Sequence, residues 1–209
     1  MKANFLKHKN KVGSELRPLY FYKSFKKPVV DARIISFGSC NFHCPYCKRK
    51  GCFRDDKGNI IDSVSKDIKD IFEICDDAIS KNQVVRLSGG DPVMFQEQSL
   101  AIFKYIKEHK GKSSIAHNGS SPEFAKKFSN YVESAAIDIK GPERYFNKVT
   151  NLSKPIAKQM YSNSLNTIQI LLKKKVLVDI RTPIFGFTTL DDLKKIAKDI
   201  NSLKGKSKF

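Results

Sequence analysis

Short runs of β-branched and other apolar residues alternate along the chain with longer stretches in which apolar residues recur at helical spacing. Strand-like runs occupy residues 29–37, 84–88, 113–118, 134–140 and 176–184. Amphipathic stretches typical of helices occupy residues 63–81, 99–109, 121–130, 156–174 and 189–203. In the first of these stretches, Ile68, Ile71, Phe72 and Cys75 fall on one helical face. The pattern therefore predicts strands that are each followed by a helix.

This order of elements predicts an α/β fold with a parallel sheet and right-handed crossovers. Periodicity alone leaves open whether the sheet curls into a barrel or stays an open, doubly wound sheet. Chemically suggestive residues stand at or just after the C-terminal end of every predicted strand: the cysteines at 40–47, the sequence GGDP at 89–92, Asn118 with Gly119, Asp138 with Lys140, and Arg181 with Thr182. Because the carboxyl ends of the strands carry the active site in barrels and open α/β sheets alike, we expect the site there.

The charge balance bears on the partners of the protein. The chain has 39 Lys or Arg and 21 Asp or Glu, which gives a formal net charge of +18. Segments 1–28 and 204–209 are strongly basic, and we expect them to form an N-terminal extension and a tail around a domain at 29–203. One interpretation is an acidic partner such as nucleic acid, a membrane surface or an acidic protein; the other is a lysine-rich, solvated surface.

Hydropathy bears on the compartment. No apolar run is long enough to span a bilayer, and the basic N-terminus lacks the apolar stretch of a signal peptide. The sequence therefore predicts a cytoplasmic protein without a membrane partner. In that reducing compartment a group of cysteines indicates metal binding or catalysis rather than disulfide bonds.

Three of the five cysteines, Cys40, Cys44 and Cys47, form the pattern C-x3-C-x2-C. A structural zinc site needs four ligands, usually in two separated pairs, and the fourth ligand here would be Cys52 or His43 at an awkward spacing. A four-iron cluster held by three thiolates leaves one iron open for a further ligand. We therefore favour an iron–sulfur cluster, and a zinc-stabilised binding module without catalysis is the alternative.

The segment CNFHCPYC, with an aromatic residue before its last cysteine, resembles the signature of the radical S-adenosylmethionine superfamily. SGGDP at residues 88–92 is similar to the glycine-glycine-acid-proline motif of that family. The resemblance covers roughly residues 30–203. It implies a partial (β/α)6-type barrel, in which the last strand is shortened here or the segment 16–23 supplies an extra strand.

The resemblance implies a role for each matching residue. Cys40, Cys44 and Cys47 would ligate a [4Fe–4S] cluster, and S-adenosylmethionine would chelate the remaining iron. Cofactor contacts would come from Tyr46, Ser88, Gly89, Gly90, Asp91, Asn118, Asp138, Lys140 and Arg181. Among these, the Gly-Gly-Asp motif would meet the methionine amino group, the tyrosine would lie beside the adenine, and the arginine could pair with the carboxylate. Reductive cleavage would then give a 5′-deoxyadenosyl radical that abstracts hydrogen from a substrate.

One branch of the superfamily matches further. The segment AIDIKGPERYFNKVT at residues 136–150 resembles the Asp-x-Lys strand of glycyl-radical-enzyme activases, closest to the activators of anaerobic ribonucleotide reductase. In that branch Asp138 and Lys140 would lie near the cofactor and the path of the radical, as catalytic residues. The resemblance implies a glycyl radical enzyme as substrate and an acidic flavodoxin or ferredoxin as electron donor. Lys48 and Arg49 replace the His-Asn pair that often follows the third cysteine.

A second function class stays open: a radical enzyme that acts on a small molecule or an RNA base, like 7-carboxy-7-deazaguanine synthase or a tRNA-modifying enzyme. The net charge favours RNA in that case, although arginines and aromatic residues are little interleaved.

Several candidate residues also have a purely structural interpretation. Asp138 with Lys140, and Arg181, could form plain ion pairs, and Asn118 could belong to an ordinary turn. Cys75 is expected in the core and His43 in solvent. His117 could face the site, although a buried histidine with its own partner is the commoner outcome.

Overall fold

The computed structural model describes residues 1–8, 11–12, 14–19, 30–47 and 63–203. One mixed sheet runs through this part of the chain, with strands β1 (Lys2–His8), β2 (Lys11–Val12), β3 (Ser14–Leu19), β4 (Val30–Phe37), β5 (Ser63–Asp67), β6 (Val84–Gly89), β7 (Lys112–His117), β8 (Ser134–Asp138) and β9 (Leu177–Arg181). The main path across the sheet is β2-β1-β4-β6-β7-β8-β9, while β3 pairs with β4 and β5 pairs with β1.

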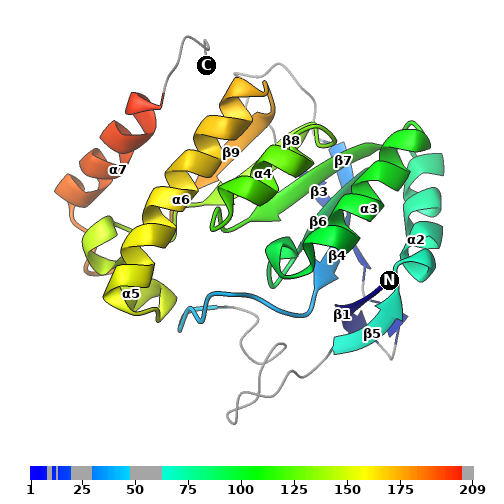
Figure 1. Ribbon diagram of the computed structural model, residues 1–209, viewed down its shortest axis with the longest axis horizontal. Helices are drawn as coiled ribbons and strands as arrows, with labels where there is room; N and C mark the ends of the chain where they lie inside the picture. The colour runs from blue at the N-terminus through cyan, green and yellow to red at the C-terminus, as the bar shows by residue number, and fades with distance from the viewer. Residues whose placement is uncertain (9–10, 13, 20–29, 48–62, 204–209) are drawn as a thin grey trace.

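The strands β4, β6, β7, β8 and β9 are parallel and lie side by side in chain order. Helices α2 (Lys69–Ser80), α3 (Gln96–Glu108), α4 (Pro122–Phe128) and α6 (Lys154–Lys173) connect them and cover one face of the sheet (Figure 1). This arrangement confirms the predicted α/β fold with its strand-and-helix alternation. Within the described residues β9 pairs only with β8, so hydrogen bonds do not close the sheet, as in a partial barrel.

The remaining strands correct the expectation of a purely parallel sheet. β1 runs antiparallel to β4 and β5, and β3 runs antiparallel to β4 from Ser14 to Leu19. The basic segment 1–28 thus contributes strands to the sheet, and Ala3 and Phe5 are buried in the main core. Of the segment proposed as an extra strand, residues 16–19 belong to β3 and residues 20–23 lie outside the described part.

The helix predicted over residues 63–81 is wrong in its first turn. Residues Ser63–Asp67 form β5, which pairs with Lys2–Leu6 of β1, and α2 begins only at Lys69. The helical spacing of Ile68, Ile71 and Cys75 is genuine, since all three are buried on one face. The segment before them alternates, so it satisfies a strand pattern equally well, and pairing with β1 decides the outcome.

The remaining helical elements follow the ends of three strands. η2 (Pro92–Phe95) follows β6, η3 (Glu143–Tyr145) and α5 (Phe146–Thr150) follow β8, and α7 (Leu190–Ser202) follows β9. Ser121 caps α4 by accepting a hydrogen bond from the N–H of Phe124, with Pro122 in the first turn, as predicted. Thr189 and Asp192 form a capping box at the start of α7.

The main core lies between the sheet and its helices. Val85, Leu87, Ile115 and Ile137 point from the central strands into it and are fully buried. Cys75 of α2 is part of the same core, as expected. A separate small cluster of Ala32, Ile34 and Val84 lies on the other face of the sheet.

Candidate active site at the strand ends

The loop that carries the cysteines follows β4 directly and is anchored on α5. Phe42 is buried and packs edge-on against Phe146, with ring centroids 6.1 Å apart. The N–H of His43 donates to the carbonyl of Thr150 at 3.0 Å, while the His43 side chain is exposed, as expected. A buried aromatic anchor and a backbone hydrogen bond thus fix the middle of the loop against the barrel.

The three candidate ligands differ in burial, since Cys40 is half-buried, Cys44 is buried and Cys47 is exposed. The N–H of Phe42 points at the Cys40 sulfur, 3.4 Å away. Burial and the charge of Asp91 raise the pKa of the Cys40 thiol to about 12. Burial likewise raises the pKa of Cys44. Thiolates at these positions need compensation, and a bound metal centre supplies it by direct coordination.

The glycines of the GGDP motif are required by the approach of two strand ends. A Cβ on Gly90 would lie 1.9 Å from the carbonyl oxygen of Ser39, and Gly89 has φ +111° with its missing Cβ 2.3 Å from the Phe37 nitrogen. The N–H groups of Gly90 and Asp91 donate to the carbonyls of Phe37 and Ser39 at 2.8 and 2.7 Å. The motif therefore fastens the start of the cysteine loop to the end of β6. Its contact with S-adenosylmethionine stays a prediction.

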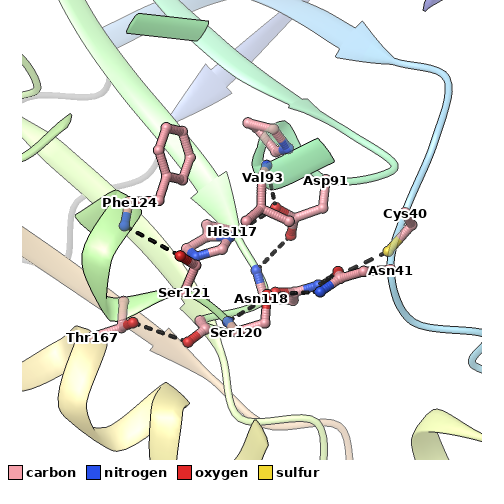
Figure 2. A network of polar contacts seen from close by, with 12 residues as sticks. Cys40, Asn41, Asp91, Val93, His117, Asn118, Ser120, Ser121, Phe124 and Thr167 are labelled. Carbon is pink, nitrogen blue, oxygen red and sulfur yellow. Dashed lines mark hydrogen bonds and ion pairs between the residues drawn. The ribbon is translucent and has the colours of Figure 1, made fainter. Parts of the chain in front are cut away.

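The side chain of Asp91 forms hydrogen bonds within the protein. Its side chain accepts from the N–H of Val93 at 2.9 Å and from the N–H of Asn118 at 2.7 Å, and it pairs with Nδ1 of His117 at 2.7 Å (Figure 2). The residue is 2% exposed. The carboxylate thus joins η2 to the end of β7, and His117 is the buried histidine with its own partner.

Asn118 carries this network on to the cysteine loop (Figure 2). Its Nδ2 donates to the side-chain oxygen of Asn41 at 2.7 Å and lies 3.9 Å from the Cys40 sulfur. Its own side-chain oxygen accepts from the N–H of Ser120 at 3.0 Å, and Asn41 donates to the Ser120 hydroxyl at 2.9 Å. The sequence singled out Asn118 but gave no signal for Asn41 or Ser120, which are ordinary loop residues until the fold brings them together.

Asp138 and Lys140 form an ion pair at the end of β8, with Nζ and Oδ2 2.6 Å apart. The Lys140 side chain is 20% exposed. Burial acts to lower the pKa of Lys140, but the charge and hydrogen bond of Asp138 outweigh it, so the pKa lies above its ordinary value. The charge of the same ammonium acts to lower the pKa of Cys40 and Cys44, against the effect of their burial.

Arg181 is exposed at the end of β9 and donates to Asp179 from Nε at 2.8 Å. The structure thus shows the ion pair that was the plain interpretation of this residue. Ser88, near the end of β6, is half-buried on the same sheet face as Asp138. Cys52, Lys48 and Arg49 lie outside the described residues.

An exposed aromatic strip borders the cysteines. Tyr46, beside Cys47, packs against Phe185 with centroids 4.9 Å apart; Phe185 stacks on Phe187 at 5.1 Å, and Phe187 meets Tyr145 at 4.9 Å. Tyr46 and Phe187 are exposed. The guanidinium of Arg144 lies 4.6 Å from the Tyr145 ring. Sequence reasoning singled out only Tyr46, because the other rings come from two separate loops.

Arg144 also holds this strip in place. It donates from Nε and from its terminal nitrogen to the two carboxylate oxygens of Asp192, both at 2.7 Å. These bonds and the Thr189 N–H hold the pKa of Asp192 well below its ordinary value. The loop before α7 is therefore tied to η3, which keeps Phe187 beside Tyr145.

Comparison with known proteins defines the family. The model of the radical SAM superfamily matches residues 34–200. A 7-carboxy-7-deazaguanine synthase from Methanocaldococcus jannaschii is 27% identical over 177 residues, which cover 81% of this chain and 70% of that protein. A provisionally named glycyl-radical enzyme activating enzyme from the same organism is 25% identical over 179 residues, covering 82% and 70%.

Solved structures show the same fold. The crystal structure of QueE from Escherichia coli superposes with a TM-score of 0.57 and 12% identity, over 99% of this chain and 80% of that one. The radical S-adenosylmethionine methyltransferase TsrM from Kitasatospora setae, with cobalamin and a [4Fe–4S] cluster bound, gives 0.62 and 8% identity over 82% of this chain and 32% of that one.

This chain belongs to the radical SAM superfamily, whose members use a [4Fe–4S] cluster and S-adenosylmethionine. The residues present fit the cluster: three cysteines lie in one anchored loop, an amide N–H points at the first sulfur, and the positive charge of Lys140 favours the thiolate form of Cys40 and Cys44. Among the described residues, no three His, Cys, Asp or Glu side chains gather as ligands of a single metal ion. No helix in that part of the chain has the length and apolar character to cross a membrane.

Proposed function

We propose that this protein activates a glycyl radical enzyme, by abstracting a hydrogen atom from the Cα of a glycine on that partner. The observation that carries the proposal is the aromatic strip beside Cys47, because its exposed rings Tyr46 and Phe187 offer a protein segment an apolar surface next to the cysteine loop. The activating enzyme at 25% identity supports it. Glycine suits this reaction since no side chain blocks the approach to its Cα.

Bound to the cysteine loop, the cluster and S-adenosylmethionine supply a carbon-centred radical by reductive cleavage. The chain's own residues place the reactants and keep water out. Phe42 and Phe146 seal the back of the cysteine loop, and the GGDP motif fixes where the loop starts. The Asp138–Lys140 pair sets a positive group beside the thiolates, which favours their charged form and the binding of a carboxylate nearby.

The net charge of +18 suits an acidic electron donor such as flavodoxin or ferredoxin. Electrostatic steering between exposed charges is screened by salt. We therefore expect reduction by such a donor to slow several-fold between about 0.05 and 0.5 M salt, whereas reduction by dithionite should change far less. Equal sensitivity of both reactions to salt would argue against a basic docking face.

A second candidate function is supported by a different observation. The relative at 27% identity is a 7-carboxy-7-deazaguanine synthase, and that name points to a small-molecule substrate. Arg86 of β6 is buried on the sheet face that points away from the helices, and its positive charge suits a small anionic substrate. The two functions differ in where the abstracted hydrogen comes from.

The experiment is anaerobic reconstitution with iron and sulfide, followed by reduction and addition of S-adenosylmethionine. A candidate glycyl radical enzyme encoded nearby in the genome is then added, and the glycyl radical signal is recorded by electron paramagnetic resonance. A stoichiometric signal that is lost with Cys44→Ala, and with an alanine at the partner's radical glycine, supports activation. If a small molecule stimulates the production of 5′-deoxyadenosine and the candidate glycyl radical enzyme does not, the activation proposal is rejected in favour of the second candidate function.

A further inference from the structure

The face of the sheet that points away from the helices carries a buried arginine. On β6, Val85 and Leu87 point into the core under the helices, while Val84 joins the small cluster on the other face. Side chains alternate along a strand, so Arg86 shares the face of Val84. By the same register Asp138, at the end of β8, lies on this face too, together with Ser114 and Ser134. Arg86 therefore belongs to the face that bears the candidate active site.

Arg86 is buried without a counter-ion in the described part of the chain. The residue is 6% exposed, and its Nε donates to the Ser114 hydroxyl at 3.0 Å. That hydroxyl donates in turn to the Ser134 carbonyl at 3.0 Å. Among the residues whose side chains the structure describes, which are 1–6, 31–47 and 64–203, no carboxylate forms an ion pair with the guanidinium. One neutral hydroxyl offsets little of the cost of burying a full charge, which proteins otherwise offset with a partner of opposite sign.

The acid whose charge acts on Arg86 already has a partner. Asp179 of β9 accepts from Nε and from a terminal nitrogen of Arg181. Burial lowers the pKa of Arg86 to about 10, the charge of Arg181 adds to that effect, and Asp179 opposes it. By the strand register, Arg86, Asp179 and Arg181 lie on the same face of the sheet, with β7 and β8 between β6 and β9.

Small side chains separate Arg86 from the ends of the central strands. Two residues further along β6, β7 and β8, the same face carries the small side chains of Ser88, Ala116 and Ala136, and Asp179 of β9 lies beside Ala136 in the same row. Ser88 and Ala116 are half-buried rather than covered. A row of small residues does not make a site by itself. Here it lies between a buried guanidinium, for which the described side chains supply no counter-ion, and the Asp138–Lys140 pair at the edge.

We propose that Arg86, oriented by Ser114, is a subsite that binds the carboxylate of a ligand lying on this face of the sheet. The rest of the ligand extends past the small residues towards Asp138 and Lys140. The carboxylate belongs either to the methionine part of S-adenosylmethionine or to a substrate. The subsite stands whether or not the protein activates a glycyl radical enzyme.

The experiment compares the reconstituted wild type with Arg86→Met, which keeps the length of the side chain, and with Arg86→Lys, which keeps the charge. Arg33→Met is the matched control, since Arg33 of β4 faces the helices and pairs with Asp77. Circular dichroism and iron content establish that each variant folds and holds its cluster. Affinities for S-adenosylmethionine and for its decarboxylated analogue are measured by equilibrium dialysis, and binding of benzoate and of neutral benzamide by saturation-transfer NMR.

Each source of the carboxylate has its own signature. If it comes from S-adenosylmethionine, Arg86→Met weakens binding of that cofactor at least tenfold, leaves the decarboxylated analogue unaffected, and Arg86→Lys restores part of the loss. If it comes from a substrate, both cofactor affinities stay unchanged, while wild type binds benzoate over benzamide and Arg86→Met does not. The proposal is overturned if all four probes bind wild type and Arg86→Met alike, or if Arg33→Met shows the same losses. A negative test for glycyl radicals would leave these outcomes unchanged.

Discussion

Asp91 and Arg86 are both buried charged residues close to the end of β6, and they differ in how many hydrogen bonds the described chain gives them. Asp91, on the helix side, receives hydrogen bonds from Val93, Asn118 and His117. Arg86, on the other face, has one serine hydroxyl. A buried charge whose bonding capacity is filled by its own chain holds the fold together. A buried charge left largely unfilled is available to a ligand.

This difference fixes the sign of what each residue contributes to stability. Removing Asp91 leaves several buried donors without an acceptor, and each of these costs roughly 1–3 kcal/mol. Removing the charge of Arg86 takes away a desolvation cost and leaves Ser114 bonded to Ser134. Substitution of Asp91 should therefore lower the free energy of unfolding strongly, whereas substitution of Arg86 should change it little.

The largest effect is expected for Asp91→Ala. The change strands the His117 imidazole and the N–H groups of Val93 and Asn118, so we expect a loss of about 3–5 kcal/mol in unfolding free energy. Anaerobic urea denaturation measures it. The cysteine loop should lose its support at the same time, which lowers iron content after reconstitution. A loss below about 1 kcal/mol with full iron content would show that the network does not position the loop.

Gly90→Ala tests the junction between this network and the cysteine loop. The added Cβ would lie 1.9 Å from the Ser39 carbonyl oxygen, so the loop has to move, at a cost of roughly 1–3 kcal/mol. Iron incorporation should fall at least several-fold. Gly186→Ala is the matched control, because nothing lies within 4 Å of the Cβ it would add. Equal iron content in the two variants would contradict the fastening role of the motif.

The sequence predicted the parts of this comparison that depend on local pattern. Strand-and-helix alternation located the parallel strands, and the cysteine spacing located the loop. The hydrogen-bond partners of the buried polar groups come from distant parts of the sequence. Asn41 and Asn118, for example, form a side-chain hydrogen bond although 77 positions separate them. β5 was missed for the same reason, since its five residues become a strand only through pairing with β1. The sequence shows Arg86 inside an otherwise apolar strand, but which described side chains surround it is known only from the structure.

Asn118→Ala extends the comparison to the electronic properties of the cluster. The change removes the bonds to Asn41 and Ser120, at a cost of about 1–2 kcal/mol, and the Nδ2 donor 3.9 Å from the Cys40 sulfur. Hydrogen bonds to cysteine sulfurs stabilise the reduced cluster, so we expect a more negative reduction potential. An anaerobic redox titration followed by electron paramagnetic resonance measures it. Lys158→Ala, on an exposed turn of α6, is the control. An unchanged potential would confine Asn118 to a structural role.

The smallest change in stability is expected for Arg86→Met, and this result closes the comparison. Replacing a poorly paired buried charge by an apolar side chain of similar length is often neutral or stabilising, so unfolding free energy should fall by less than about 1 kcal/mol or rise. Urea denaturation of the protein without ligand measures it beside Asp91→Ala. A loss as large as that of Asp91→Ala would mean that Arg86 is a structural element whose partners are sufficient. A stable variant that no longer distinguishes a carboxylate from its neutral analogue would instead show that the charge is kept for binding, at the expense of the fold.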